Sequence, residues 1–580
     1  MNVKLAAVGL LTVLAGCVTP PAETNLTVAT DRFIQEYHRM RPLTGVALGW
    51  HQFDGQFVVP TAAQSADERA FFRAADRQFP EAALATAPAD LRRDLALVRR
   101  QVETELMGYD GFRADRRNPM FYVGAVDVSI YLKRDWKPLD DRVRNLTVIL
   151  RRTPEVFAAA RAQLEAKLPR PWVETAIQMA EGTATFLEKD VADVAQGAKR
   201  RDVVGEFAVA NARAVRELRE FAAWLKSDRL PEANDAFALG EEWFARMLRS
   251  EMVSLTPAEV LQLGLRELKA EQERFAAAAR VIDPARPALA VFKQVQAEHP
   301  TEESLLPDTR RNLEAIRQFI VDRQLVTIPS EVRAKVEATL PPFRATSFAS
   351  MDTPGPFETK ATEAIYYVTP TEPEWTAQQK DEWLTAFNYY TTDVVSIHEA
   401  YPGHYVQFLA LNASPASTAA KVFGSYAFIE GWAHYTEQMV LEAGFAGPEK
   451  MANPPTAADR IRAAKYQLAQ SSEALLRLCR LCCAVKLHCQ GMTVDEATQF
   501  FVDNAFYERQ PARSEAIRGT FDPGYCFYTL GKLEILKLRE EVKAKEGAAF
   551  SLKSFHDRLL SQGAPPVKIL RESLLGAGGK

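Results

Sequence analysis

The chain has 580 residues, of which 47% are hydrophobic and 25% are charged, and its formal net charge is −4. Such a length can bury a large core and normally forms several domains or one large two-lobed body. The near-neutral charge argues against nucleic-acid binding, which usually shows as a basic excess, and it indicates no strongly acidic or basic partner.

The N-terminus has the pattern of an export signal. Lys4 precedes an apolar run over residues 5–14, and the run ends in Leu-Ala-Gly-Cys at residues 14–17. A charged start, a short apolar run and a small-residue cleavage site are typical of a signal peptide rather than of a spanning helix. Leu-Ala-Gly-Cys is also typical of a bacterial lipobox, which predicts that residues 1–16 are removed and that Cys17 is lipidated. The alternative is an ordinary signal peptide in which Cys17 is incidental.

The mature protein is then expected to be lipid-anchored to a bacterial membrane and to face the periplasm or the cell exterior. Val18 follows the cysteine, so the aspartate that retains some lipoproteins at the inner membrane is missing, and the choice of membrane stays open. No later segment of the sequence is long and apolar enough to span a bilayer. Residues 17–30 are expected to form a tether, with the folded body beginning near Asp31.

Residues 31–345 are expected to form an N-terminal helical region. Apolar residues recur there at spacings of three and four, which is the period of an amphipathic helix. One such series is Val215, Leu218, Ala222 and Leu225. The sequence shows no fixed-period repeat, no glycine-rich phosphate loop and no G-x-S-x-G motif.

Two helix starts are marked by capping residues. Thr256, Pro257 and Glu259 supply an N-cap, a proline at the first helical position and a glutamate three residues after the cap. Thr493 and Glu496 form the same kind of capping box nearer the C-terminus. Both segments are therefore predicted to begin helices.

The composition changes around residues 330–350, and Pro341-Pro342 marks the junction to a second region, residues 346–580. The best strand candidate of this region is A-I-Y-Y-V-T-P at residues 364–370. It is short, β-branched and aromatic, and a proline closes it. The rest of the region is expected to be helical.

The most informative segment is H-E-A-Y-P-G-H at residues 398–404. His398 and His404 are six residues apart, which places them roughly 240° apart on a regular helix, so they do not share a face. Pro402 cannot donate to the carbonyl of His398, and Gly403 tolerates backbone conformations closed to other residues. The sequence therefore predicts a helix that bulges or unwinds around the proline and brings both histidines to one side. The alternative is two unrelated histidines at a helix end.

This segment carries the residue types of a catalytic zinc site. Two neutral imidazoles and one carboxylate can hold Zn²⁺ and leave a fourth position for water. His398 and His404 are the candidate imidazole ligands, and Glu430, in the downstream E-G-W-A-H-Y, is the candidate carboxylate. Glu399 follows His398 directly, so it points elsewhere and can take a proton from the metal-bound water, as the glutamate of H-E-x-x-H does. We therefore expect one Zn²⁺ per chain, with Glu399 as general base and then proton donor to the leaving amine.

Two further residues are candidates for supporting roles. His434 lies one helical turn after Glu430, so it is expected to orient a ligand or to replace Glu430 as one. Asp393, five residues before His398, is a candidate hydrogen-bond partner for a ligand histidine, although a capping or solvated aspartate fits the sequence equally well. For Glu430 the alternative is a solvated surface position, which the glycine and tryptophan that follow it disfavour.

These motifs, together with D-P-x-x-x-x-Y-x-x-G-K at residues 522–532, resemble the DUF885 family of bacterial proteins. That family is similar to gluzincin-type metallopeptidases. The resemblance implies a mainly α fold, with a large helical two-lobed body around a deep cleft and a small β-sheet or hairpin beside the zinc helix. It covers most of the mature chain, is sharpest from Pro354 to Arg539, and implies a peptidase without naming a substrate. The family more often has an apolar residue at the position of His434.

The resemblance also implies substrate contacts. In gluzincin-like peptidases an edge strand beside the zinc helix binds the substrate backbone, which would give Tyr366 and Tyr367 a substrate-binding role. A structural hairpin under the cleft is an equal alternative. Tyr528 fits the tyrosine of Y-x-x-G-K, and His488 falls where the family usually has a histidine. With Tyr525, they are candidates to stabilise the oxyanion, whereas buried side chains with satisfied polar tips are the alternative.

Arg518 lies just before the tyrosine motif. A guanidinium can hold a carboxylate with two parallel hydrogen bonds, so Arg518 is a candidate to bind the C-terminus of a substrate. A surface salt bridge is the alternative.

Four cysteines cluster beside His488: Cys479, Cys482, Cys483 and Cys489. Their spacing is not that of two C-x-x-C pairs, and the leucines and valine around them predict one buried helix in which free cysteines act as small apolar residues. An exported protein can also form a disulfide, for example to Cys526, but the sequence cannot assign one.

The sequence therefore predicts a zinc-dependent peptidase that hydrolyses peptide bonds, favouring short peptides, outside the cytoplasm. Its expected partners are a peptide substrate and a membrane reached through the lipid anchor, with no nucleic acid and with the oligomeric state open. One alternative is a zinc amidase that acts on a non-peptide amide of the cell envelope. A second is a binding lipoprotein with a structural metal site, for example with His434 as the fourth ligand.

Overall fold

The computed structural model describes residues 23–340, 343–344 and 347–576 of the chain. The predicted signal peptide, Cys17 and the Pro341-Pro342 junction lie outside these residues. The described chain is mainly helical and contains one small three-stranded sheet, which confirms the mainly α prediction.

The first part of the chain is a succession of helices joined by short turns. They are α1 (Glu23–Met40), α2 (Pro42–Ala47), α3 (Ala62–Gln78), α4 (Glu81–Thr86), α5 (Ala89–Leu106), α6 (Ala114–Arg117), α7 (Met120–Ala125), α8 (Ile130–Lys133), α9 (Leu139–Gln163), α10 (Arg170–Phe186), α11 (Ala192–Gln196) and α12 (Arg201–Trp224). Helix α1 begins before Asp31, and its Leu26 and Thr30 are buried. The folded body therefore starts within the segment predicted to be a tether.

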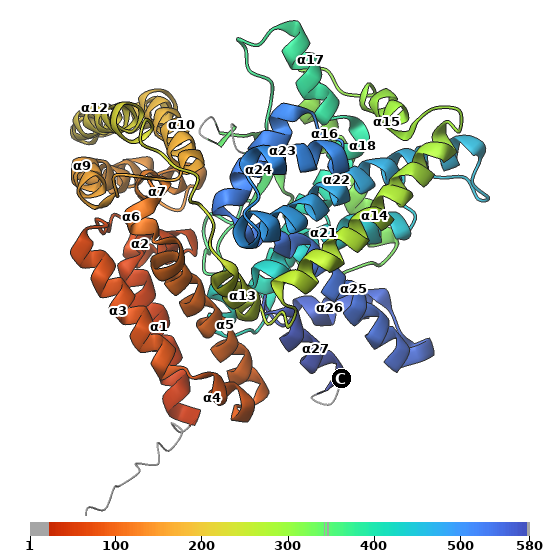
Figure 1. Cartoon of the computed structure of the whole chain (residues 1–580), viewed down its shortest axis with the longest axis horizontal. Coiled ribbons are helices and arrows are strands. Elements are labelled where there is room, and N and C mark those ends of the chain that lie inside the picture. Colours follow the sequence, from red (N-terminus) through yellow and green to blue (C-terminus); the bar gives the residue numbers. More distant parts are fainter. Residues whose placement is uncertain (1–22, 341–342, 345–346, 577–580) are drawn as a thin grey trace, which may run out of the picture.

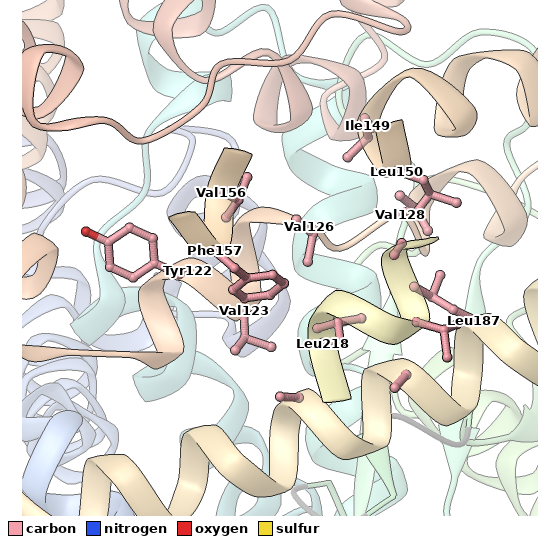
Figure 2. Packing of buried hydrophobic residues seen from close by; sticks show 14 of the residues in the cluster. Tyr122, Val123, Val126, Val128, Ile149, Leu150, Val156, Phe157, Leu187 and Leu218 are labelled. Carbon is pink, nitrogen blue, oxygen red and sulfur yellow. The ribbon is translucent and has the colours of Figure 1, made fainter. Parts of the chain in front are cut away.

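A continuous apolar core joins α7, α9, α10 and α12. Figure 2 shows Val126, Phe157 and Leu218 as part of this core, where Phe157 and Leu218 come from the long helices α9 and α12. Apolar residues at helical spacing supply these contacts, because spacings of three and four keep them on one face of each helix. The series predicted from Val215 to Leu225 is confirmed as the buried face of α12 and the turn that follows it.

The remainder of the chain contains the sheet and the longest helices. The helices before the sheet are α13 (Glu241–Ser250), α14 (Pro257–Ile282), α15 (Ala288–Gln296) and α16 (Leu305–Asp322), and the strands are β1 (Lys335–Ala338), β2 (Ala349–Asp352) and β3 (Ile365–Val368). The later helices are α17 (Ala377–Ala386), α18 (Tyr389–Glu399), α19 (His404–Ala413), α20 (Thr418–Val422), α21 (Tyr426–Glu442), α22 (Ala457–Cys489), α23 (Val494–Ala505), α24 (Arg509–Phe521), α25 (Phe527–Glu546), α26 (Leu552–Leu560) and α27 (Val567–Leu575).

Both capping boxes predicted from the sequence are present. Thr256 accepts from the amide of Glu259, whose side chain accepts from the threonine amide in return, at the start of α14. Thr493 and Glu496 form the same reciprocal pair at the start of α23. Two backbone N–H groups that a helix end leaves without partners are thereby satisfied at each site.

The sheet has the order β1-β3-β2, with β1 parallel and β2 antiparallel to β3. The strand predicted at residues 364–370 is confirmed as β3, but it is the central strand and not an edge. The prediction failed there because β1 was overlooked, although its Lys-Val-Glu-Ala sequence alternates polar and apolar residues as a strand does. The edge strand that lies against α18 is β2.

Figure 1 shows the helices from α1 to α12 grouped on one side of the molecule and most elements from α14 onward on the other, whereas α20 packs against α1 and α5. This grouping does not coincide with the predicted boundary at residue 345, because α14, α15 and α16 precede that boundary and lie with the later elements. The two regions and the deep cleft between two lobes stay predictions. Helix α14 lies along α22, and α21 crosses α25. Among the described helices, none has both the length and the apolar character to cross a membrane.

The crossing of α21 and α25 depends on two glycines. A Cβ on Gly531 would lie 1.7 Å from the carbonyl oxygen of Ala427, and one on Gly431 would lie 2.5 Å from the backbone of Gly531. Both distances are far inside van der Waals contact, so any side chain at either position would push the two helices apart. Helix α21 carries Glu430, which makes this crossing part of the architecture of the site.

We expect Gly531→Ala to lower the free energy of unfolding by about 1–3 kcal/mol, because the added methyl group overpacks the helix crossing. Gly205→Ala is the matched control, since a Cβ there meets nothing within 4 Å on the exposed face of α12. Because alanine has a higher helix propensity than glycine, Gly205→Ala should raise the free energy of unfolding by about 0.5–1 kcal/mol. Urea unfolding of both variants measures the difference, and equal midpoints would contradict the role of the glycine crossing.

Candidate metal centre

The helix that carries His398 breaks before His404. Helix α18 ends at Glu399, residues 400–403 leave the helical path, and α19 begins at His404. The amide of Gly403 donates to the carbonyl of Ile397 at 3.0 Å, so the chain folds tightly back on the end of α18. The predicted break around the proline is therefore confirmed.

The break has no room for a side chain at residue 403, so glycine is required there. A Cβ there would lie 1.7 Å from the carbonyl oxygen of His398. The residue has φ −66°, so the need for glycine comes from close backbone approach and not from a left-handed conformation. The indole N–H of Trp432 donates to the carbonyl of Pro402 at 2.9 Å, which ties the break to α21.

The break brings three predicted ligands together. Nε2 of His398 lies 3.6 Å from Oε2 of Glu430, and Nε2 of His404 lies 3.5 Å from the same oxygen. All three ligand atoms lie within 4.8 Å of one another, and no other such group of three occurs in the described part of the chain. Ligand atoms about 2.1 Å from a tetrahedral zinc are about 3.4 Å apart, so these separations suit one ion.

The chemistry of this donor set also fits a metal. Oε2 of Glu430 is buried and has no hydrogen-bond partner, although it faces two imidazoles. Burial would raise the pKa of Glu430, but the neighbouring His404 and His398 lower it well below its usual range, so the carboxylate is ionised. A buried carboxylate beside two imidazole nitrogens, with an oxygen left unpaired, is the environment that a divalent cation satisfies.

A buried glutamate that the sequence analysis missed supports this group. Oε1 of Glu437 accepts from Nδ1 of His398 at 2.8 Å, so it fixes the ring with Nε2 toward Glu430 and His404. Arg477 lies 3.1 Å from the same oxygen. Burial would raise the pKa of Glu437, but Arg477 and His434 lower it well below its usual range. A carboxylate behind a ligand histidine raises the basicity of the ring and holds its orientation.

His434 lies beside Glu437 and outside the candidate ligands. Its Nδ1 is 3.0 Å from Oε2 of Glu437, so both oxygens of that carboxylate are held by imidazoles. Burial and the nearby Lys532 lower the pKa of His434 to about 3, which keeps it neutral at pH 7. The geometry thus gives His434 the orienting position, through Glu437, and not that of a replacement for Glu430.

Glu399 lies at the end of α18, next to the candidate ligands. Burial raises its pKa, the two imidazoles lower it, and the result is a pKa above the usual range of a glutamate. Among the described residues, none donates a hydrogen bond to its carboxylate. The group is therefore available to exchange a proton with a molecule bound at the candidate site.

Tyr528 lies beside the ligands on α25. Its ring is 6.3 Å from that of His398 and nearly parallel to it, with an interplanar angle of 13°. Burial and Glu430 raise the pKa of Tyr528 to about 12, although Arg518 and Arg480 oppose them, so the phenol is protonated at neutral pH. Tyr525, by contrast, is wholly buried in an apolar cluster.

The structure does not bring His488 to the site. Its Nδ1 accepts from the amide of Leu239 at 3.0 Å, and its Nε2 lies 2.8 Å from the carbonyl of Gly519. Burial lowers the pKa of His488 to about 4. Both ring nitrogens are used by the backbone, so the predicted catalytic role is wrong and His488 joins three segments of the fold.

Asp393 also lies away from the ligands. Its carboxylate accepts from Asn312 at 3.0 Å and from the hydroxyl of Tyr466 at 2.6 Å. The predicted hydrogen bond to a ligand histidine is therefore wrong. Burial outweighs these two bonds and raises the pKa of Asp393 to about 6.

The predicted substrate-binding residues are in different places. Tyr366 and Tyr367 lie on the central strand and are buried, and the hydroxyl of Tyr366 is 3.2 Å from Oγ of Ser396 on α18. They form part of the interior and not of a free edge. Arg518 is paired with Asp522 at 2.9 Å, which is the alternative that the sequence left open. Its binding to the C-terminus of a substrate stays a prediction.

The cysteine segment forms the second half of α22, where three of its four cysteines are fully buried. All five cysteines of the described chain are free thiols. The prediction of a buried helix is confirmed, and the disulfide that was left open does not occur.

A comparison with known families gives a match over residues 42–574 to a family described as bacterial proteins of unknown function, DUF885. The chain belongs to the DUF885 family. No curated protein is significantly similar to it.

Two solved structures share the fold of this DUF885 protein. One is described as a lipoprotein of unknown function from Shewanella oneidensis, with 24% identity, 95% of this chain and 99% of that chain covered, and a TM-score of 0.75. The other, described as a lipoprotein from Colwellia psychrerythraea, has 16% identity, coverages of 96% and 99%, and a TM-score of 0.76. An M32 carboxypeptidase from Deinococcus radiodurans R1 matches at 12% identity over 95% of both chains, and its TM-score of 0.42 is too low to carry an argument.

Glu437→Gln should weaken zinc binding by about 10–100-fold, because the amide cannot support the ring of His398 as a carboxylate does. Competition with a chelator of known affinity measures the effect. Glu442→Gln is the matched control, since Glu442 lies on the same helix but points to Gln438 and Arg539 at the surface. Equal zinc affinity in the two variants would contradict the supporting role of Glu437.

Asp393→Asn should change how stability depends on pH. A carboxyl with a raised pKa in the folded state stabilises the fold while protonated, and that stability is lost as the pH rises through the folded value of about 6. The variant has no such loss, so relative to the wild type it should gain about 2 kcal/mol between pH 4.5 and pH 8. Urea unfolding of both metal-free proteins at the two pH values measures the gain, and a pH-independent difference would contradict it.

Proposed function

We propose that this protein is a zinc-dependent peptidase that acts on short peptides outside the cytoplasm. One observation carries the proposal: the ligand atoms of His398, His404 and Glu430 lie together, and the carboxylate of Glu399 is near enough to interact electrostatically with all three. Two imidazoles and a carboxylate leave an open coordination position, which is the composition of a catalytic zinc site rather than a closed structural one.

The three ligand residues would hold Zn²⁺, which supplies Lewis-acid polarisation of water and of the scissile carbonyl when it is bound. Glu399 then acts as the general base: its carboxylate accepts a proton from the attacking water and passes it to the leaving amine nitrogen. The raised pKa of Glu399 brings its proton affinity closer to that of the groups with which it exchanges.

Tyr528 is the proposed donor to the oxyanion. Its phenol is protonated at neutral pH, and its ring lies against that of His398 on the side of α25. A hydrogen-bond donor that is fixed before the reaction stabilises the charge that develops on the carbonyl oxygen. Arg477, Arg480 and Arg518 surround this ring, each with its guanidinium carbon less than 6 Å from the ring centre.

The edge strand β2 is the proposed binding element for the peptide backbone. It lies against α18, and its register places Met351 opposite Tyr366, whose hydroxyl reaches Ser396 two residues before His398. An extended peptide can add to such an edge by main-chain hydrogen bonds. We assign this role to β2 and not to β3, because β3 is paired with a strand on both edges.

We also propose that the mature protein is anchored by lipid at Cys17 and faces away from the cytoplasm. The Leu-Ala-Gly-Cys sequence supports this placement. The descriptions of the two structural relatives as lipoproteins agree with it.

The protein that begins after Cys17 should bind about one zinc per chain and cleave at least one member of a short-peptide panel. Glu399→Gln should keep the zinc and lower kcat about 10²–10⁴-fold, because it removes the general base alone. Glu382→Gln, at an exposed position on α17, is the matched control. Metal analysis and peptide hydrolysis measure both effects, and a protein that takes up no zinc would contradict the mechanism.

A further inference from the structure

The edge strand beside the metal centre is held by the N-terminal helices. Strand β2 is four residues long, all of them only partly buried, and it is paired on one side only. So short a strand has little cooperative support of its own. Its position therefore depends on the groups that hold its ends.

Arg134, directly after α8, holds both strands of the β2–β3 hairpin at the end where the connecting loop leaves them. Its guanidinium donates to the carboxylate of Asp352, the last residue of β2, and to the backbone carbonyl of Glu363, two residues before β3. Lys133 lies 3.4 Å from the second oxygen of Asp352. Arg134 is buried, so this charged contact is shielded from water and salt. The planar fork of arginine suits two acceptors at once.

The loop of the same hairpin docks on the start of the chain. The amide of Phe357 donates to the carbonyl of Leu48 at 3.0 Å, and the ring of Phe357 stacks on that of Trp50 with centroids 4.8 Å apart. Next to them, Nε2 of His51 lies 2.9 Å from Glu358. These contacts come from the turn after α2, far in sequence from Arg134.

The backbones approach closely at this dock. A Cβ on Gly355 would lie 2.4 Å from the carbonyl oxygen of Ala47, and one on Gly49 would lie 2.3 Å from the amide of Glu358. On the opposite side, Asn412 of α19 donates to the carbonyl of Pro354 at 3.3 Å. The hairpin is thus clamped between the N-terminal helices and the helix that begins with His404.

We propose that Arg134 is a positioning residue for the peptide substrate, and that the N-terminal helices set the affinity of the site by fixing β2 through the Arg134–Asp352 contact. This inference rests on the proposed function. Arg134 touches neither the candidate ligands nor Glu399. Its loss should therefore weaken substrate binding and leave the chemistry at the metal unchanged.

The test uses Arg134→Gln, Asp352→Asn and the double variant in the protein that begins after Cys17. Each should raise KM about tenfold with kcat within about twofold, which is the signature of lost binding shared by substrate and transition state. Because both substitutions break the Arg134–Asp352 contact, the increase in KM of the double variant should be smaller than the product of the two single increases. Arg134→Lys keeps the positive charge but cannot donate to two acceptors through a planar guanidinium. Its KM should therefore lie between those of the wild type and Arg134→Gln.

Hydrogen exchange supplies a readout that does not need activity. The backbone amides of residues 349–352 should exchange roughly tenfold faster in Arg134→Gln, while those of α21 stay unchanged. Arg144→Gln is the matched control, because Arg144 forms a similar contact with Asp141 on the exposed side of α9. Zinc content should equal that of the wild type in every variant.

The outcomes separate the two proposals. If the wild type cleaves peptides but the KM of Arg134→Gln is unchanged, the positioning role is overturned and the proposed peptidase function still stands. Unchanged hydrogen exchange at β2 in Arg134→Gln would have the same meaning. Equal KM increases in Arg134→Gln and Arg144→Gln would also overturn the positioning role. A wild-type protein that binds zinc but cleaves no peptide would overturn the proposed function and the substrate role of β2 with it, even where exchange shows that Arg134 orders the strand.

Discussion

The site depends on one steric constraint, the return of the chain at Gly403. Two histidines six residues apart do not share a face of a regular helix, and here α18 stops and α19 starts between them. The return is tight enough that only hydrogen fits on the Cα of Gly403, against the carbonyl of His398. The spacing of the motif and its glycine are therefore one feature, because without the break His404 could not meet Glu430.

The second layer of the site is a set of buried charges that satisfy one another. The carboxylate of Glu437 lies within hydrogen-bonding or ion-pair distance of His398, His434 and Arg477, and it has no exposed surface. A lone carboxylate in such a place would be strongly disfavoured, whereas one with three donors is stable and rigid. The same interactions that make Glu437 tolerable in the interior also fix the ring of His398. Support of the fold and orientation of the ligand are inseparable at this residue.

The sequence could predict the features that depend on residues close together in the chain, and it could not predict those that depend on distant ones. The helix starts at Thr256 and Thr493 and the break at the proline follow from residues within one turn, and all were predicted correctly. Glu437 could have been found, since it lies seven residues after Glu430 and so shares its helix face. The hydrogen-bond partners of Asp393 and His488 could not be predicted from the sequence, because they lie far away along the chain. The central place of β3 depends on pairing with β1 and β2, which are only four residues long, and a short alternating run such as that of β1 is a weak strand signal.

The long N-terminal helical region holds two of the elements that frame the site. Glu251, at the end of α13, accepts from the amide of Tyr426 at the start of α21 at 2.9 Å, and Arg100 of α5 lies 2.5 Å from the same carboxylate. A negative charge at that helix end also complements the helix dipole. Helix α21 carries Glu430, so this contact fixes one ligand, just as Arg134 fixes the strand beside α18. The N-terminal region therefore acts as a frame whose buried ion pairs hold the short sheet and the ligand helix at fixed positions relative to each other.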